Sequence, residues 1–123
     1  AVVKQMNDRG LIIQPDQKDL YVNTLRRQIR HGKEHYFLDR MLVAGIVEAR
    51  GAERFGMIAD TLPSGQLKRF YHSITRSERE HQGLFFELAE HYFEPEEVGP
   101  RLEELLVEEA NIVSQLPIRA ALH

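Results

Sequence analysis

The chain has 123 residues, which is typical of one domain and enough to bury roughly two thirds of its unfolded surface. No apolar run approaches the ~20 residues of a membrane-spanning helix, and the N-terminal sequence AVVKQMNDRG lacks the layout of a signal peptide. Because the chain has no cysteine, disulfides and thiolate metal sites are excluded, and any metal must be held by nitrogen and oxygen. We therefore expect a soluble, cytoplasmic protein without membrane contact.

The net charge of -3 indicates neither an obvious nucleic-acid binder nor an extremely acidic protein. Residues 1–86 carry 14 Lys and Arg against 10 Asp and Glu, whereas residues 87–123 carry 2 against 9. The charge is thus polarised along the chain, which leaves a basic face possible in its first part.

Apolar residues recur at spacings of three and four, and no segment alternates cleanly in the manner of a strand, so we predict an all-α protein. The opening AVVKQMNDR is typical of the last turns of a helix that ends at Gly10. A short helix is predicted from about residue 17 to residue 31. Its expected buried side chains are Leu20, Leu25 and Ile29.

A long helix is predicted next at about residues 34–61. After a turn at residues 62–65, with Ser64 as a capping residue, a second long helix is predicted to run to about residue 93. The inward stripes are expected to be Leu38, Met41, Gly45, Glu48, Ala52, Phe55 and Ala59 on the first, and Leu67, Phe70, Ile74, Glu78, His81, Phe85 and Leu88 on the second. A last helix is predicted to begin at Pro95 or Pro100 and to end before Pro117.

Small residues are dense in the helix at 34–61, where they are Ala44, Gly45, Ala49, Gly51, Ala52, Gly56 and Ala59. Each glycine inside a helix costs about 1 kcal/mol relative to alanine, so a close approach by another group is expected to compensate. We interpret the pattern as tight packing between helices, with room for a substrate channel as the alternative.

One pair of residues has the spacing of a metal-binding unit. Glu78 and His81 are three residues apart, hence on one helix face and about 4.5 Å apart along the axis. Carboxylate proteins of the four-helix-bundle class use this Glu-x-x-His unit twice, each copy with one further glutamate from a neighbouring helix. A surface ion pair or a hydrogen-bonded core histidine is the alternative.

The hairpin supplies the further glutamate. Residues equally distant from the turn lie at the same height in two antiparallel helices, which places Glu48 level with Glu78 and His81. Glu53 is turned by about 140° from Glu48 and is interpreted as a residue that supports the site or forms a surface ion pair. Two carboxylates and an imidazole form a ligand set that suits iron or manganese.

The segments MLVAGIVEARGAERF (41–55) and FYHSITRSEREHQGLFFELAEHYF (70–93) resemble the bacterial tRNA hydroxylases of the MiaE type. The similarity runs from about Val2 to the C-terminus and is carried by the blocks VEARxxERF and SExxH, with 30-residue spacing. These ferritin-like di-iron monooxygenases hydroxylate the isopentenyl group of a 2-methylthio-adenosine beside the anticodon. The resemblance implies a ferritin-like helical bundle. Its implied iron ligands are Glu48, Glu78 and His81, with Arg50 and Glu53 supporting the site.

The resemblance also implies two irons per complete site, and tRNA, dioxygen and an electron donor as partners. Phosphate binding requires positive charge, and the densest basic cluster consists of Arg26, Arg27, Arg30, His31 and Lys33. We take Arg26, Arg27, Arg30 and Lys33 as candidate tRNA contacts, with a solvated helix face as the alternative. Tyr21 and Tyr36 are candidates for stacking on a base.

The sequence also predicts whether two further groups of residues are buried or exposed. Phe70, Phe85, Leu38 and Met41 are interpreted as core, with an apolar approach to the metal as the alternative. The acidic residues of the last part of the chain are expected to form a solvated helix face that repels RNA. These are Glu94, Glu96, Glu97, Glu103, Glu104, Glu108 and Glu109.

By the resemblance, the other half of the ligand set, a glutamate and a second Glu-x-x-His, is expected before residue 1. We therefore expect residues 1–123 to form a single ferritin-like domain that is the C-terminal part of the bundle, and the isolated fragment to be inactive. A homodimer could bring two Glu48, Glu78, His81 sets together. Another ferritin-like oxidase or iron-handling protein, or a metal-free helical interaction module, are the alternative functions.

Overall fold

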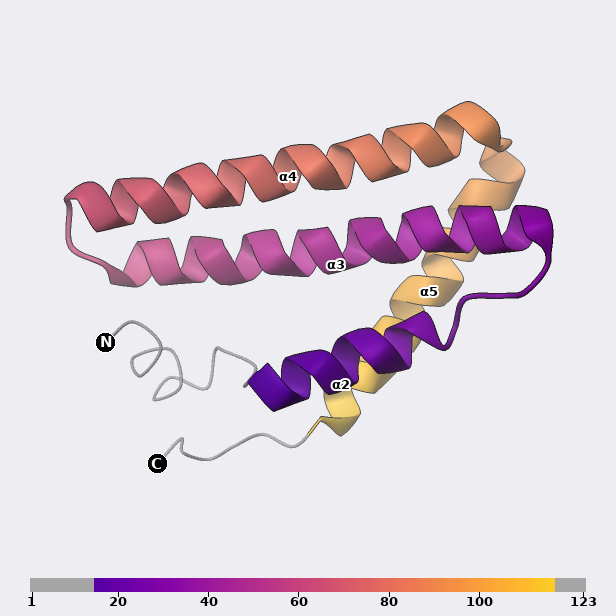
Figure 1. Ribbon diagram of the computed structural model, residues 1–123, viewed down its shortest axis with the longest axis horizontal. Coiled ribbons are helices and arrows are strands. Elements are labelled where there is room, and N and C mark those ends of the chain that lie inside the picture. The colour runs from indigo at the N-terminus through magenta and orange to yellow at the C-terminus, as the bar shows by residue number, and fades with distance from the viewer. Residues whose placement is uncertain (1–14, 117–123) are drawn as a thin grey trace.

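A computed structural model of the chain describes residues 15–116 (Figure 1). The described part contains four α-helices, which are α2 (Pro15–Arg26), α3 (Lys33–Thr61), α4 (Gln66–Tyr92) and α5 (Pro95–Gln115). The predicted all-α class is confirmed. The helix end expected before Gly10 and the tail after Pro117 lie outside the described residues. None of the described helices is long and apolar enough to cross a membrane.

The two long helices form the predicted antiparallel hairpin. In Figure 1, α3 and α4 lie side by side along their whole length and are joined by a tight connection at one end. The residue that precedes α4 is Gly65, whose φ of 150° suits glycine, and no side chain caps the helix. The prediction that Ser64 caps α4 was therefore wrong. Of the two predicted starts for α5, Pro95 is the one found.

The first described helix ends earlier than predicted, at Arg26 rather than at residue 31. The backbone after it is held by side chains from distant helices. Asp39 on α3 accepts a bond from the backbone N–H of Arg30 at 2.9 Å, and Arg101 on α5 donates to the carbonyl of Gln28 at 2.8 Å. The connection passes through Gly32 at a positive φ of 101° before α3 begins. These bonds satisfy backbone groups that a longer helix would have paired internally.

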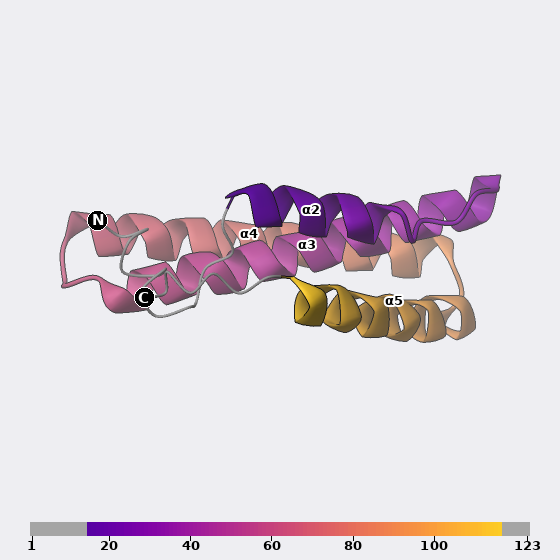
Figure 2. The same ribbon diagram turned by 90° about the horizontal axis from the view of Figure 1, so that it is seen from below.

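The hydrophobic core lies where α2 and α5 meet the half of the hairpin farther from its turn (Figures 1 and 2). All four helices contribute to it. Its buried members are Tyr21, Leu25, Leu38, Met41, Leu42, Val43, Ile46, Ala89, Val98, Leu105 and Ile112. Leu38 and Met41 are thus plain core, as predicted. Leu20 is 47% exposed, so its predicted burial was wrong.

The predicted inward stripe of α4 is largely open. Thr75 and Ala89 are the buried residues of this helix, whereas Leu67, Phe70 and Leu88 are between 44% and 56% exposed. The reason is that, among the described residues, α4 packs mainly against α3, and only the side that faces α3 is covered. Phe70 therefore belongs to the surface of the described part and not to its core.

The small residues of α3 do allow a close approach. A Cβ added to Gly45 would lie 2.6 Å from a ring carbon of Phe86, closer than two carbon atoms can pack. A Cβ on Gly51 would be 3.6 Å from the Glu78 Oε2 atom, which is ordinary contact. At Gly45 the structure thus confirms tight packing of α3 against α4.

Candidate metal centre

The hairpin brings the three predicted ligands together. Glu48 comes from α3, and Glu78 and His81 come from successive turns of α4. One ligand atom from each side chain lies within 4.8 Å of the others. Among residues 15–116, this is the one group of three or more histidine and acidic side chains with such spacing. The predicted alignment of the three residues across the hairpin is confirmed.

The cluster is partly open to solvent. The Glu48 side chain is 29% exposed and that of His81 is 53% exposed, and 3.9 Å separates His81 Nδ1 from Glu48 Oε2. The Oε2 atom of Glu48 is nevertheless itself buried and has no hydrogen-bond partner among the described residues. A buried carboxylate oxygen without a donor is costly, and a cation would remove that cost.

The electrostatics of the carboxylate pair agree with this geometry. A hydrogen bond shared with Glu78 raises the pKa of Glu48 to about 7, and burial and the negative charge of Glu78 act in the same direction. The charge of His81 opposes them. Glu48 and Glu78 thus resist carrying two negative charges together unless a proton or a cation is shared between them. Two carboxylate oxygens and an imidazole nitrogen are a suitable set for iron or manganese.

Arg50 and Glu53 contact each other rather than the three candidate ligands. The Nη1 atom of Arg50 donates to Glu53 at 2.9 Å, so the ion-pair alternative for Glu53 is the one found. The other guanidinium nitrogens donate to both carboxylate oxygens of Glu109, each at 2.6 Å. That Arg50 and Glu53 support a metal site stays a prediction.

Glu109 is an exception to the predicted solvated acidic face, whose members Glu94, Glu96, Glu97, Glu103 and Glu104 are exposed. It is fully buried and also accepts a hydrogen bond of 2.5 Å from the hydroxyl of Tyr21. Tyr21 itself is 4% exposed, and burial together with this bond raises its pKa. Tyr21 is therefore not available to stack on a base. The sequence does hold a signal for Glu109, because it shares the buried stripe of α5 with Leu105 and Ile112.

Asp39 is a second buried carboxylate that the sequence analysis missed. It is fully buried in the core end of the molecule and receives two bonds from the Arg101 guanidinium, at 2.8 and 3.0 Å. The Arg30 side chain adds two more, at 3.0 and 3.1 Å. Because Arg101 is 62 residues away in sequence, no local pattern reveals the partnership.

The basic cluster divides into two parts. Arg30 is engaged with Asp39, whereas Arg26, Arg27 and Lys33 are exposed. A contact of any of these four with tRNA stays a prediction. Tyr36, the other stacking candidate, is 45% exposed, and its hydroxyl accepts a hydrogen bond of 2.9 Å from Arg40.

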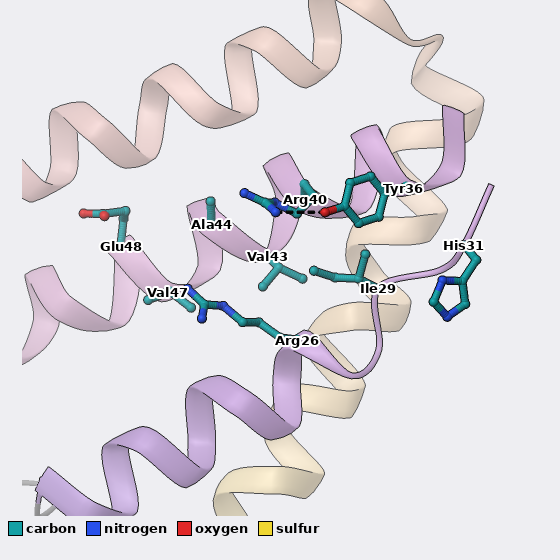
Figure 3. Close-up of a pocket in the computed structure, with 9 residues that line it drawn as sticks. All are labelled: Arg26, Ile29, His31, Tyr36, Arg40, Val43, Ala44, Val47 and Glu48. Carbon is teal, nitrogen blue, oxygen red and sulfur yellow. Dashed lines mark hydrogen bonds between the residues drawn. The ribbon is translucent and has the colours of Figure 1, made fainter. Parts of the chain in front are cut away.

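A pocket of about 600 Å³ lies between the end of α2 and the neighbouring face of α3, and it reaches Glu48 (Figure 3). Its lining combines basic, aromatic and apolar side chains. The lining residues are Arg26, Ile29, His31, Tyr36, Arg40, Val43, Ala44, Val47 and Glu48.

Comparison with known proteins shows which family the chain belongs to. The sequence matches the tRNA-(MS[2]IO[6]A)-hydroxylase (MiaE) family over residues 1–123. The chain belongs to this family. A MiaE relative from Pseudomonas putida, named tRNA 2-(methylsulfanyl)-N(6)-isopentenyladenosine(37) hydroxylase, is 29% identical over 112 residues. The aligned part is 91% of this chain and 54% of the relative, so the chain spans about half the length of that protein.

No solved structure gives a significant match to the chain. Membership of the MiaE family confirms the resemblance that the VEARxxERF and SExxH blocks carry. It also places the candidate ligands Glu48, Glu78 and His81 within a family of tRNA hydroxylases.

Proposed function

We propose that this chain provides Glu48, Glu78 and His81 as ligands of an iron centre in a tRNA hydroxylase. The proposed substrate is the isopentenyl group of 2-methylthio-N6-isopentenyladenosine in tRNA. The observation that carries the proposal is the convergence of these three side chains within 4.8 Å in a member of the MiaE family. Support also comes from the buried Glu48 oxygen, which has no hydrogen-bond donor within residues 15–116.

Hydroxylation of an allylic carbon by dioxygen needs dioxygen activation, which iron supplies when it is bound, with electrons from a separate donor. The contribution of the described residues is to hold and neutralise the cation. Glu48 and Glu78 bring carboxylate oxygens from facing helices, and His81 adds an imidazole nitrogen from the next turn of α4. The extensive packing of α4 against α3 holds the two carboxylates close to each other.

Metal binding by the purified chain tests the ligand assignment. Titration with Fe²⁺ under anaerobic conditions, or with Co²⁺ followed by its absorption spectrum, should show saturable binding. Replacement by glutamine in Glu48→Gln or Glu78→Gln should abolish it, because a neutral amide no longer compensates the charge of the cation. Glu80→Gln is the matched control, since Glu80 lies on the same helix, is exposed and is outside the cluster. Equal binding by all variants would refute the assignment.

The reaction is tested in cells from which the gene has been deleted. Their tRNA should contain the isopentenyl nucleoside and lack its hydroxylated form, as shown by mass spectrometry of digested tRNA. The wild-type gene and the Glu80→Gln control should restore hydroxylation, whereas Glu78→Gln should not. Persistence of the hydroxylated nucleoside in the deleted strain would overturn the proposed function.

A further inference from the structure

The pocket beside the metal cluster has an ordered lining. Along α3 its side chains follow one stripe at spacings of three, four and one residue. In chain order this stripe is Tyr36, Arg40, Val43, Ala44, Val47 and Glu48. On the other side, Arg26 and Ile29 come from α2 and the connection that follows it. Figure 3 shows Arg26 and Arg40 on opposite walls with Val43 between them.

The two arginines are available to a ligand. Both are exposed, and neither forms an ion pair with another residue of the described part. Arg40 is held in place by its hydrogen bond to the hydroxyl of Tyr36, and its guanidinium carbon lies 5.7 Å from the centre of that ring. Positive charge without an internal partner favours an anionic ligand such as a phosphate.

The floor of the pocket favours a different chemistry. Val43, Ala44 and Val47 form an apolar strip along α3 between Arg40 and Glu48, and the Arg26 side chain extends toward this strip from the opposite wall (Figure 3). Arg40 and Glu48 are eight positions apart along the helix, a rise of about 12 Å. A simple anion would not need such a strip, and a purely apolar ligand would not need two arginines. The lining therefore matches a molecule that is anionic at one end and apolar at the other.

We propose that this pocket binds the modified nucleotide, with its phosphates at Arg26 and Arg40 and its N6 substituent along Val43, Ala44 and Val47. The proposal rests on the proposed function, and it names the surface that presents the substrate to the metal cluster. Tyr36 then offers its exposed ring to the base, in the way that aromatic side chains stack on unpaired bases of RNA. Glu48 closes the far end, so the apolar substituent ends beside a candidate metal ligand.

The volume agrees with this occupant. Pockets for small molecules and cofactors usually measure about 300 to 1,000 Å³ and combine apolar walls with a few polar groups. The pocket of about 600 Å³ is in this range. The exposed arginines at its basic side leave the rest of an RNA strand free to continue into solvent.

The test compares two RNA hairpins of identical sequence, one with adenosine and one with N6-isopentenyladenosine at the same loop position. Fluorescence anisotropy with the metal-free chain gives affinities without any catalysis. The wild type should prefer the isopentenyl hairpin by about tenfold for every two methylene-sized groups buried on the strip. Equal affinity for the two hairpins would overturn the assignment.

Two kinds of variant separate the two ends of the pocket. Ala44→Leu fills the strip and should remove the preference for the isopentenyl hairpin. The isosteric Val47→Thr should reduce the preference without adding volume. Arg40→Gln should weaken binding of both hairpins alike. It should also reduce the slope of the logarithm of the affinity against the logarithm of the salt concentration by about 1. Arg69→Gln is the control, because Arg69 is an exposed arginine of α4 outside the pocket.

The outcomes also separate this proposal from the proposed function. Loss of hydroxylated nucleoside in the deleted strain together with equal hairpin affinities would reject the pocket and keep the reaction. A preference for the isopentenyl hairpin that Ala44→Leu removes supports the pocket, even where nucleoside analysis rejects the reaction. A preference that survives both Ala44→Leu and Val47→Thr would place the substituent elsewhere and reject the pocket.

Discussion

Replacing the buried Glu109 by glutamine should destabilise the fold strongly, although Glu109 lies outside the candidate metal centre. The carboxylate is fully buried, and its oxygens take two hydrogen bonds of 2.6 Å from Arg50 and one of 2.5 Å from Tyr21. Glutamine has the same shape as glutamate, but an amide NH₂ group replaces one of the two accepting oxygens. This NH₂ group would then face an N–H or O–H donor that bonds to Glu109 in the wild type. The variant therefore breaks an ion pair and places two donors against each other.

The magnitude follows from the exposure of the two partners. Removing one member of a fully buried ion pair costs about 3 to 5 kcal/mol, because the remaining charge is left without compensation. The Arg50 side chain is 44% exposed and can be rehydrated, which lowers the cost. We expect Glu109→Gln to lower the free energy of unfolding by about 2 to 3 kcal/mol. Tyr21→Phe, which removes one neutral donor, should cost about 1 kcal/mol.

Urea unfolding followed by far-ultraviolet circular dichroism measures these changes. Glu103→Gln is the matched control, because Glu103 is an exposed glutamate of the same helix and should change stability by less than about 0.5 kcal/mol. A double-mutant cycle between Tyr21→Phe and Glu109→Gln should show coupling, since the two residues share a bond. If Glu109→Gln were no more destabilising than Glu103→Gln, the buried network would not stabilise the fold as argued.

Three further predictions concern packing and pH. Gly45→Ala should lower the free energy of unfolding by about 1 to 3 kcal/mol, because the added Cβ would lie 2.6 Å from an aromatic ring. At Gly83 an added Cβ has no neighbour within 4 Å, so Gly83→Ala should raise the free energy of unfolding by about 0.5 to 1 kcal/mol in the same urea assay. Gly51→Ala should keep metal affinity and Gly51→Val should weaken it, as measured by Co²⁺ titration, because only the larger side chain displaces the carboxylate of Glu78. Burial would raise the pKa of Asp39, but hydrogen bonds from its two arginine partners outweigh burial and lower the pKa below its ordinary value. The stability from Asp39 is then complete above its unfolded pKa and is lost as the pH falls through the lower folded value, so Asp39→Asn should flatten the acid side of a stability profile.

The hairpin could be predicted because its signals are local. Apolar periodicity marks both long helices, and the Leu62-Pro63-Ser64-Gly65 sequence marks the turn between them. The early end of α2 could not be predicted, since the bonds that replace its last turn come from Asp39 and Arg101 on other helices. Periodicity likewise shows which side of α4 is apolar, but it does not show how much of that side is covered.

In the candidate site, too, the features that follow from local sequence could be predicted, and those that depend on distant helices could not. Glu48, Glu78 and His81 could be placed together because the register of an antiparallel hairpin follows from the position of its turn. The partner of Arg50 could not, because Glu109 lies 59 residues away on a helix whose angle to α3 no local pattern determines. A charged residue on a helix is also read by default as exposed, and only its place in a buried stripe argues otherwise.

The glycines of α3 connect the packing of the hairpin to the chemistry proposed for it. Gly45 lets the ring of Phe86 approach the α3 backbone, and Gly51 leaves room for the carboxylate of Glu78. A carboxylate from each helix can share one cation only if the helices are close enough for short side chains to meet. Each glycine costs about 1 kcal/mol in helix propensity, and in exchange it allows both the close packing of the helices and the geometry of the site. Alanine at Gly45, or a residue larger than alanine at Gly51, would push these groups apart, so the small residues predicted for packing also set the geometry of the metal cluster.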